Sequence, residues 1–470
     1  MTGDGRVGAS ADGRYPRMVL LVALAGMFAT TFPVTVLTLA IPTIADDFGV
    51  DESGLAWVVT LPMLGSALAL PVLGKLGDLH GHRKVFVIGF SIAVVTTALT
   101  ATAASPAQLI AWRTLTQVAG ASTMPSSLAL INSVHHGEAR ARAMGWWSMV
   151  AAGAPVAGLT IGAPVIDAVG WPSLFLMQAA LMVVPVTASW RILRETPRRE
   201  ARFDAAGAAL LALGLGPLLL AVDQVREWGV VAVPTVACLA VSATGLVAFV
   251  VVERRVAQPL VPLDFFHSPG TRASLVGSFL TGASYMGAFF LASLLLVRQF
   301  DYSLTGAVPI LSIRPLLFAV TSPLGGWATG RFGSRAAALG GCVALAGGLT
   351  GLALGSSLSS LLVVVVAGFL LQGIGYGLLR PAISTALADA VDDGDLGMAG
   401  AAERLAGQLG ITFGITIMAS VYAGDVDRFA AAFGVGAVLA VAAAFVALGL
   451  RRRPTLPVVA EAAVAPDVAA

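Results

Sequence analysis

Three charged residues that could bind ions or transfer protons lie inside long apolar segments of this sequence. Arg113 and Arg314 each stand well inside such a segment, and Glu403 lies one or two helical turns into another. A charge in an apolar environment is costly unless it is paired or hydrated, so each is a candidate for substrate binding or proton transfer. The alternatives are structural: Arg113 could extend its charged end to an interface, and Arg314 and Glu403 could link neighbouring helices.

The depth of the two arginines follows from the helical rise. Arg113 is about six residues into its segment, which places it about 9 Å deep at 1.5 Å per residue, and Gln117 follows one turn later. Arg314 lies near the middle of its segment and is followed by Pro315. We expect Pro315 to break the helix, so that freed carbonyl groups satisfy the guanidinium group.

The composition predicts that these segments are embedded in a bilayer. Of 470 residues, 57% are hydrophobic and 11% are charged, and the mean hydropathy is +0.87. A soluble domain has about a quarter charged residues. Lipid offers the backbone no hydrogen-bond partner, so each apolar run of about twenty residues must form a helix. The runs are too long and too continuously apolar for the strands of an outer-membrane barrel. The sequence therefore predicts an all-α polytopic membrane protein.

The apolar runs predict fourteen transmembrane helices with both termini in the cytoplasm. Most of the 28 Lys and Arg residues, with Arg380 and Arg404 counted among them, then fall in cytoplasmic segments, as the positive-inside rule requires. The basic residues therefore mark topology and do not indicate a nucleic-acid partner. The expected spans are 18–40, 55–73, 85–104, 107–131, 143–166, 173–190, 207–222, 235–252, 273–297, 303–325, 336–356, 360–387, 397–421 and 429–450.

The most basic connection, from Arg191 to Arg202, divides the chain into two six-helix bundles with two extra linker helices between them. The predicted organisation is a cytoplasmic N-terminal tail (1–17), an N-terminal bundle (18–190), a central cytoplasmic loop (191–206), the linker helices (207–252), a second cytoplasmic loop (253–272), a C-terminal bundle (273–450) and a cytoplasmic C-terminal tail (451–470).

Two of the cytoplasmic connections share a spacing of glycine and arginine. Gly74, Gly81 and Arg83 after the second span correspond to Gly326, Gly333 and Arg335 after the tenth. A repeat between two halves is typical of secondary transporters, in which two bundles rock about a central site.

The first of these connections resembles the loop motif of the major facilitator superfamily, which contains Gly, Leu, Asp, Gly and paired basic residues. The matching residues are Gly74, Asp78, Gly81 and Arg83. Asp78 stands where it could cap the start of a helix and pair with basic residues across the bundle interface. The resemblance implies a gating loop that latches the outward-facing state; the alternative is a solvated basic turn.

Two further stretches resemble the fourteen-span drug/proton antiporter branch of this superfamily. Arg113 and Gln117 resemble a motif of span four whose arginine is implicated in proton transfer. Pro155, Gly158 and Gly162 resemble the antiporter motif of span five, where small residues allow close packing and proline bends the helix. The resemblance covers nearly the whole chain and implies a proton-coupled exporter.

The sequence departs from this branch at two places. In span five, Leu159 and Ala163 replace an expected proline and glycine. In span one, Pro33 stands where the branch has an aspartate, so the usual carboxylate for protons and cationic drugs is missing. We therefore expect Glu403 to be the best remaining carboxylate. We also expect neutral or anionic substrates, because the arginines at 113 and 314 give the lining a positive sign.

The leading interpretation is proton-coupled export of a small drug-like molecule, antibiotic or metabolite across the inner membrane by alternating access. Proton-coupled uptake of a small solute is the alternative that the altered span-five motif favours. A membrane sensor or an enzyme would need an extramembrane domain, and no connection is long enough for one. We therefore expect a transporter without catalytic residues, which acts as a monomer on a small molecule and protons within the lipid bilayer.

The remaining chemistry-bearing residues suggest no further site. Cys238 and Cys342 lie in apolar runs, which argues against a disulfide framework or a metal site, and no cofactor is expected. The histidines near the basic connections are expected in cytoplasmic loops without a role: His80, His82, His135 and His136.

Overall fold

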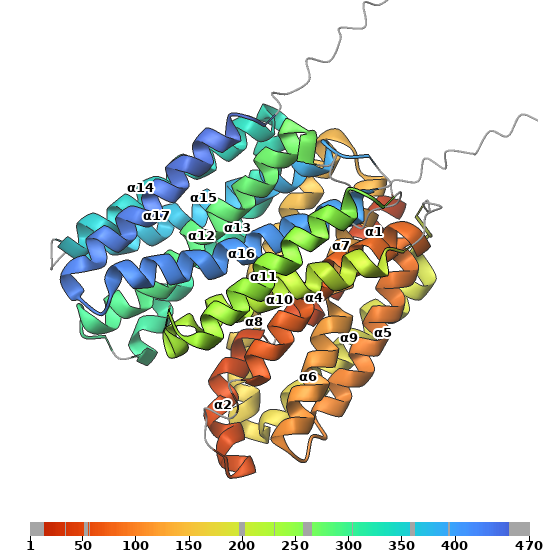
Figure 1. Ribbon diagram of the computed structural model, residues 1–470, viewed down its shortest axis with the longest axis horizontal. Coiled ribbons are helices and arrows are strands. Elements are labelled where there is room, and N and C mark those ends of the chain that lie inside the picture. Colours follow the sequence, from red (N-terminus) through yellow and green to blue (C-terminus); the bar gives the residue numbers. More distant parts are fainter. Residues whose placement is uncertain are drawn as a thin grey trace, which may run out of the picture.

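The computed structural model in Figure 1 describes residues 14–32, 34–50, 55, 57–196, 203–229, 231–256, 266–302, 304–357, 362–392 and 395–450. Within these ranges the chain is helical apart from turns and short connections, and it contains no strand. Twelve of the described helices are long and apolar enough to cross a bilayer. The all-helical architecture expected from the composition is confirmed.

The N-terminal half is a series of helices joined by short connections. In chain order they are α1 (Arg14–Thr31), α2 (Val34–Phe48), α4 (Trp57–His80), α5 (His82–Thr100), α6 (Pro106–Gly120), α7 (Thr123–Val134), α8 (Gly137–Val169) and α9 (Trp171–Ile192).

A helical pair and the C-terminal half follow. These helices are α10 (Ala205–Trp228), α11 (Val233–Glu253), α12 (Pro269–Arg298), α13 (Leu304–Phe332), α14 (Ser334–Ser357), α15 (Leu362–Ala388), α16 (Leu396–Tyr422), the short 3-10 helix η3 (Val426–Arg428) and α17 (Phe429–Ala447). Each expected span from the seventh onward corresponds to one of the long helices, which generally extend a few residues beyond the predicted ends.

The first expected span is two helices instead of one. The helix α1 ends at Thr31 and α2 begins at Val34. Pro33, outside the described residues, stands at the break, and proline both lacks the N–H of the helical ladder and disfavours a helical residue before it. The freed carbonyl of Phe32 lies against Gly158 of α8, where a Cβ would come within 1.5 Å of that oxygen. Gly158 is therefore required for this close approach.

The fourth expected span is also divided, into α6 and α7. The break falls at Ala121 and Ser122, just before Pro125. The ring of a proline clashes with the carbonyl four residues back, which here belongs to Ala121. Ala121 itself keeps helical dihedral angles, so the interruption is local.

The helices form two bundles, α1 to α9 and α12 to α17, which meet through the pairs α4–α16 and α8–α13. Figure 1 shows the bundles in contact at one end and diverging toward the other, where the outer end of α2 lies far from those of α14 and α17. The end at which α4 finishes and α16 begins is called the latch end below.

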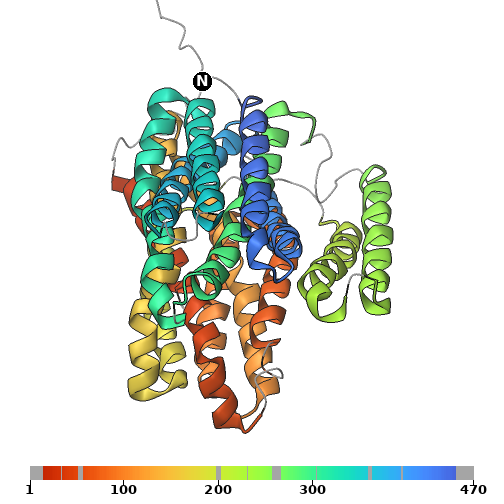
Figure 2. The same ribbon diagram turned by 90° about the vertical axis from the view of Figure 1, so that its left-hand side faces the viewer.

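The helices α10 and α11 form a hairpin at the side of the two bundles (Figure 2). The two helices cross closely at glycines, since a Cβ on Gly245 would lie 2.8 Å from the backbone nitrogen of Gly214. Leu211 and Leu215 of α10 pack in one apolar cluster with Met398 of α16, and Leu68 of α4 joins it. The hairpin therefore covers the seam between α4 and α16.

Candidate functional site

Asp78 joins the two bundles at the latch end. Its side chain is buried, and its two carboxylate oxygens accept hydrogen bonds of 3.2 Å from the backbone N–H groups of Gly397 and Met398. These N–H groups belong to the first turn of α16, whose own N-cap residue Asp395 makes no side-chain capping bond. A carboxylate is stabilised at a helix N-terminus by the exposed N–H groups and the helix dipole. Asp78 thus caps a helix of the opposite bundle, as its position in the sequence suggested.

The motif around Asp78 is almost entirely helical, whereas the sequence suggested a gating loop. The helix α4 continues through Gly74 and Asp78 to His80, and Gly81 alone separates it from α5. Gly74 allows close packing on α16, because a Cβ there would lie 2.8 Å from the carbonyl oxygen of Gly397. Gly81 has a φ of 98°, which residues with a Cβ rarely adopt.

The basic partners of this motif lie within its own bundle. His82 is buried, and its Nε2 lies 2.9 Å from an oxygen of Asp78. The guanidinium group of Arg83 donates to the carbonyl oxygen of Trp190 on α9 at 2.8 Å, and its backbone N–H donates to Glu195. Across the interface, the groups that Asp78 meets in the described part of the chain are the backbone N–H groups of α16, and the expected pairing with basic side chains is not found there. His82 was expected in a loop without a role, whereas it begins α5 and contacts Asp78.

The second copy of the motif also packs across the bundle interface, but without a capping carboxylate. Gly326 of α13 faces α8, where a Cβ would lie 2.4 Å from the carbonyl oxygen of Ala141. Gly333 repeats the positive φ of Gly81, at 88°. Gly330, which occupies the place of Asp78 in the repeat, packs against Glu138. The two halves therefore share close helix packing and differ in the latch.

A second polar contact joins the bundles beside the first. Arg140 at the start of α8 is buried and lies 2.7 Å from a carboxylate oxygen of Asp389, which follows α15. Its other guanidinium nitrogens donate to the backbone carbonyls of His135 and Asn132. Burial lowers the pKa of His135 below its usual value of 6.5, so this histidine is neutral near pH 7. This contact was not predictable from the sequence because neither residue belongs to a recognisable motif.

A cavity of about 140 Å³ lies between the bundles, away from the latch end of α16. Gln117 of α6 lines it, as do Arg404 and Gln408, which are one turn apart on α16. The rest of its wall comes from α1, α4, the end of α6 and the start of α7: Thr30, Thr31, Met63, Ser66, Ala67, Leu70, Gly120, Ala121, Thr123 and Met124. Arg404 was counted with the cytoplasmic connections, whereas the structure places it inside α16 at the wall of this cavity.

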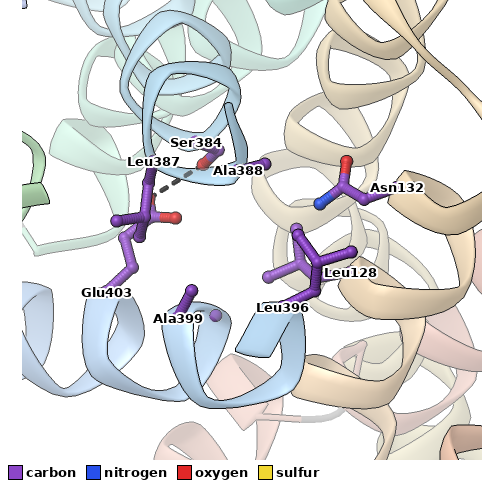
Figure 3. Close-up of a pocket in the computed structure, with 9 residues that line it drawn as sticks. Leu128, Asn132, Ser384, Leu387, Ala388, Leu396, Ala399 and Glu403 are labelled. Carbon is purple, nitrogen blue, oxygen red and sulfur yellow. Dashed lines mark hydrogen bonds between the residues drawn. The ribbon is translucent and has the colours of Figure 1, made fainter. Parts of the chain in front are cut away.

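Glu403 lies beside Arg404 on α16 but faces a different space. One of its carboxylate oxygens lies 3.1 Å from the guanidinium of Arg380 and accepts a 2.8 Å hydrogen bond from Ser384, both on α15. The carboxylate is 3% exposed and lines a small cavity at the bundle interface, shown in Figure 3. Arg380 is buried within α15, and not in the cytoplasmic connection to which the sequence analysis assigned it.

Arg113 is buried inside the N-terminal bundle, away from both cavities. Its guanidinium lies 5.4 Å from the ring centre of Phe175 on α9. Among the described residues, no carboxylate forms an ion pair with it, and its Nε has no hydrogen-bond partner. A cation over an aromatic face is favourable, but this contact alone leaves Arg113 a charge without a counter-ion.

Arg314 is enclosed by aromatic rings within the C-terminal bundle. Its guanidinium lies 3.7 Å from the ring centre of Tyr285 and 4.6 Å from that of Phe289, and it donates a 3.1 Å bond to Gln372. The ring of Tyr285 in turn stacks on Tyr376 at 3.9 Å. Within the described part of the chain, no carboxylate pairs with this arginine.

The expected helix break at Arg314 is not present. The helix α13 runs continuously from Leu304 to Phe332 with three prolines inside it, one of them Pro315. Aromatic rings and a side-chain amide, rather than freed backbone carbonyls, therefore stabilise the guanidinium group. The sequence could not reveal this, because Tyr285 and Gln372 lie on α12 and α15, distant in the chain.

The residues of the span-five motif lie on α8 and serve packing. Gly158 meets the break between α1 and α2, as described above, and Gly162 is buried. Pro155 lies inside α8, which remains one helix over its 33 residues. At the latch side of this motif, Gly145 faces Ser322 and Gly326 of α13 so closely that any side chain would collide with their backbone.

Comparison with known proteins identifies the family. The model of the Major Facilitator Superfamily matches residues 23–314 and 274–466. The chain belongs to the Major Facilitator Superfamily.

Its relatives in this superfamily include proteins named for export and resistance. The chain is 30% identical to multidrug resistance protein Stp of Mycobacterium tuberculosis over 86% of its length and 76% of that protein. It is also 30% identical to the cephamycin export protein CmcT of Amycolatopsis lactamdurans, over 88% of its length and 87% of that protein. The solved structure of the human organic anion transporter MFSD10 has the same fold, with a TM-score of 0.69, 18% identity and coverage of 92% of this chain and 99% of that one.

Membership of this superfamily makes the protein a transporter of the cell membrane, which it crosses several times. The superfamily expectation drawn from the sequence motifs is confirmed.

Proposed function

We propose that the protein exports a small drug-like molecule or antibiotic in exchange for protons, by alternating access between two bundles. The names of the relatives support the export of such molecules. The proposal includes fourteen spans, with α1–α2 and α6–α7 each crossing once, in a six-plus-two-plus-six arrangement. Both termini then face the cytoplasm, and so does the latch end.

The position of the contacts supports a closed cytoplasmic side. Asp78, Arg140 and the glycine contacts between α8 and α13 hold the bundles together there. The central cavity of about 140 Å³ is smaller than the roughly 300–1,000 Å³ that drug-sized ligands occupy. Substrate binding therefore requires the bundles to separate around Gln117, Arg404 and Gln408.

The single observation that supports the proposed proton coupling is the environment of Glu403. It is a buried carboxylate at the bundle interface, whose one ion pair, with Arg380, lies inside a single bundle. Protonation of Glu403 removes the charge that holds Arg380, and a released arginine next to Arg404 increases the positive charge beside the central cavity. Substrate and proton thus act on adjacent positions of one helix, α16, which provides a route for exchange.

The charge of the site favours neutral or anionic substrates. The carboxylate of span one is replaced by Pro33, while Arg404 lines the cavity. A unit charge about 4 Å away is worth about 4 kcal/mol at an effective dielectric constant of 20. The carboxylate of a cephamycin would therefore be attracted where a monovalent cationic dye is repelled.

Transport into proteoliposomes distinguishes the directions of coupling. An antiporter accumulates a cephamycin when the lumen is more acidic than the outside, because protons leave as substrate enters. A symporter accumulates it when the lumen is more alkaline. We expect accumulation only with the acidic lumen, and loss of this accumulation in Glu403→Gln. Accumulation driven only by an alkaline lumen would establish the uptake alternative.

A further inference from the structure

A small space separates Glu403 from the opposite bundle. Leu128 and Asn132 of α7 form one wall, α15 contributes Ser384, Leu387 and Ala388, and α16 contributes Leu396, Ala399, Gly400 and Glu403. The cavity measures about 10 Å³, which is the space that one water molecule needs. Figure 3 shows Asn132 reaching toward it from α7, across from Glu403 and Ser384.

The cavity has the polar partners that a buried water requires. Asn132 is 3% exposed, and Figure 3 shows its amide nitrogen directed toward the space. Ser384 and the carboxylate of Glu403 lie on the other side of the space. A buried water needs two to four polar partners, and the Asn132 amide, the Ser384 hydroxyl and the Glu403 carboxylate lie around this space.

We propose that one water molecule occupies this cavity, bound by Asn132, and transfers protons between the cytoplasmic side and Glu403. This inference rests on the proton coupling proposed above. The water accepts a proton on its oxygen and donates another of its protons to the carboxylate. Glu403 becomes a neutral carboxylic acid, its bond to Arg380 is lost, and the water is unchanged. Asn132 is a positioning residue for this step.

The cavity is linked to the latch by Asn132 itself. The backbone carbonyl of Asn132 accepts a 3.1 Å bond from Arg140, which also holds Asp389 of the opposite bundle. Opening of that contact therefore moves the wall of the cavity and admits solvent from the latch end. The charged or titratable groups near Glu403 are Arg380 and Tyr376 on α15 and Arg404 on its own helix, whereas the wall from α7 supplies only Asn132 and Leu128.

A pH-jump infrared experiment on the purified protein in lipid tests the proposal without any transported substrate. The signal is the carboxylic acid band that appears on acidification and is absent in Glu403→Gln. Asn132→Leu removes the polar group and fills the space, and Ala399→Val fills it from α16 without changing Asn132. We expect both to slow the rise of the band at least about tenfold, which corresponds to about 1.4 kcal/mol in the barrier.

Two controls separate the water from a general effect on packing. Asn132→Ser keeps a polar group and leaves room for water, so the rate should stay near that of the wild type. Leu130→Met changes a buried residue of the same helix that does not line the cavity and should also have little effect. Two results would overturn the inference. One is an unchanged rate in both Asn132→Leu and Ala399→Val, and the other is a carboxylic acid band that persists in Glu403→Gln. Absence of transport driven by a pH gradient would instead overturn the proposed function.

Discussion

At the scale of single residues, Asp78 has the strongest claim to a role in the transport cycle. It is a buried carboxylate that accepts two backbone hydrogen bonds from α16 and a third contact from His82. Hydrogen bonds to a charged group contribute about 1.5–3 kcal/mol each. Because these bonds cross the bundle interface, they stabilise the latched state relative to any state in which the bundles separate there.

Asp78→Asn is therefore expected to leave membrane insertion intact but to impair turnover. An asparagine can still accept one bond from the first turn of α16, but it brings no charge to that helix terminus. The measurement is the initial rate of cephamycin uptake per mole of protein, with surface expression as the control for insertion. Wild-type turnover by a well-expressed Asp78→Asn protein would contradict a gating role for this residue.

Arg314 is the second residue whose environment leads to a prediction. Its charge is surrounded by Tyr285, Phe289 and Gln372, without a counter-ion in the described part of the chain. If the substrate passes this arginine, Arg314→Gln should reduce transport of a cephamycin at least about tenfold, and that of its neutral methyl ester much less. The ratio of the two initial rates is the measurement.

The exposed Arg298 at the end of α12 provides a matched control. Arg298→Gln makes the same change of net charge outside the aromatic cluster and should leave the ratio unaltered. Strong wild-type export of ethidium, together with an unchanged ratio in Arg314→Gln, would exclude a role for Arg314 in selecting anions.

At the scale of helices, α16 connects the functional features. Its first turn binds Asp78, Glu403 faces the small cavity, and Arg404 with Gln408 lines the central cavity. A shift of this one helix would therefore change the latch, the proton site and the substrate cavity together. Coupling between proton and substrate then needs no long chain of intermediate residues.

The two polar contacts between the bundles should differ in strength. Although Arg140 is buried, the side chain of Asp389 is 49% exposed, so solvent screens the pair and keeps its contribution small, whereas Asp78 is buried. Asp389→Asn should thus increase the population of the opened state only a few-fold, and Asp78→Asn about tenfold or more. Equal effects of the two substitutions, or a larger effect at Asp389, would contradict this ranking.

The labelling rate of a single cysteine measures that population. Ser322→Cys, in a background without Cys238 and Cys342, places the thiol where Ser322 is buried on α13 against α8. A water-soluble maleimide can reach it only when the bundles separate, so its rate follows the open fraction. The same cysteine without a further substitution provides the reference rate.

Helices and motifs were largely predictable, whereas the contacts that combine them were not. Runs of apolar residues located every long helix because lipid enforces helical hydrogen bonding. The capping role of Asp78 followed from its type and position, but its partner, the start of α16, lies more than 300 residues away in the chain. The importance of Arg140, Asp389 and Asn132 follows only from the fold. The helix break predicted at Pro315 is absent, which shows that tertiary packing overrides the local helix-breaking tendency of a proline.

At the scale of the whole molecule, the hairpin α10–α11 covers one side of the two bundles. It packs its apolar residues across the seam between α4 and α16, the same two helices that the latch connects. On the other face, α8 and α13 pack directly through Gly145 and Gly326. Separation of the bundles at the latch end therefore requires the hairpin to slide along one of them, so the hairpin would oppose this separation.

The last prediction concerns topology, which the helix count alone does not determine. Twelve described helices can each cross a bilayer, and the remaining question is whether the pairs α1–α2 and α6–α7 cross once or turn back. At about 1.5 Å per residue, α6 with 15 residues and α7 with 12 are each too short for a hydrocarbon core of about 30 Å. Together they are long enough, and Ala121 between them keeps helical angles. We therefore expect a single crossing.

Three reporter fusions decide the matter for the α6–α7 pair. Between Asp51 and Arg199 lie α4, α5, the α6–α7 pair, α8 and α9, so the number of crossings is odd only if the pair crosses once. A fluorescent protein fused after Arg199 or Arg453 should be active in the cytoplasm, and alkaline phosphatase fused after Asp51 should be active outside. If the reporters fused after Asp51 and Arg199 lie on the same side of the membrane, α6 and α7 turn back within it. If the reporters fused after Arg199 and Arg453 lie on opposite sides of the membrane, one of the eight helices from α10 to α17 does not cross it.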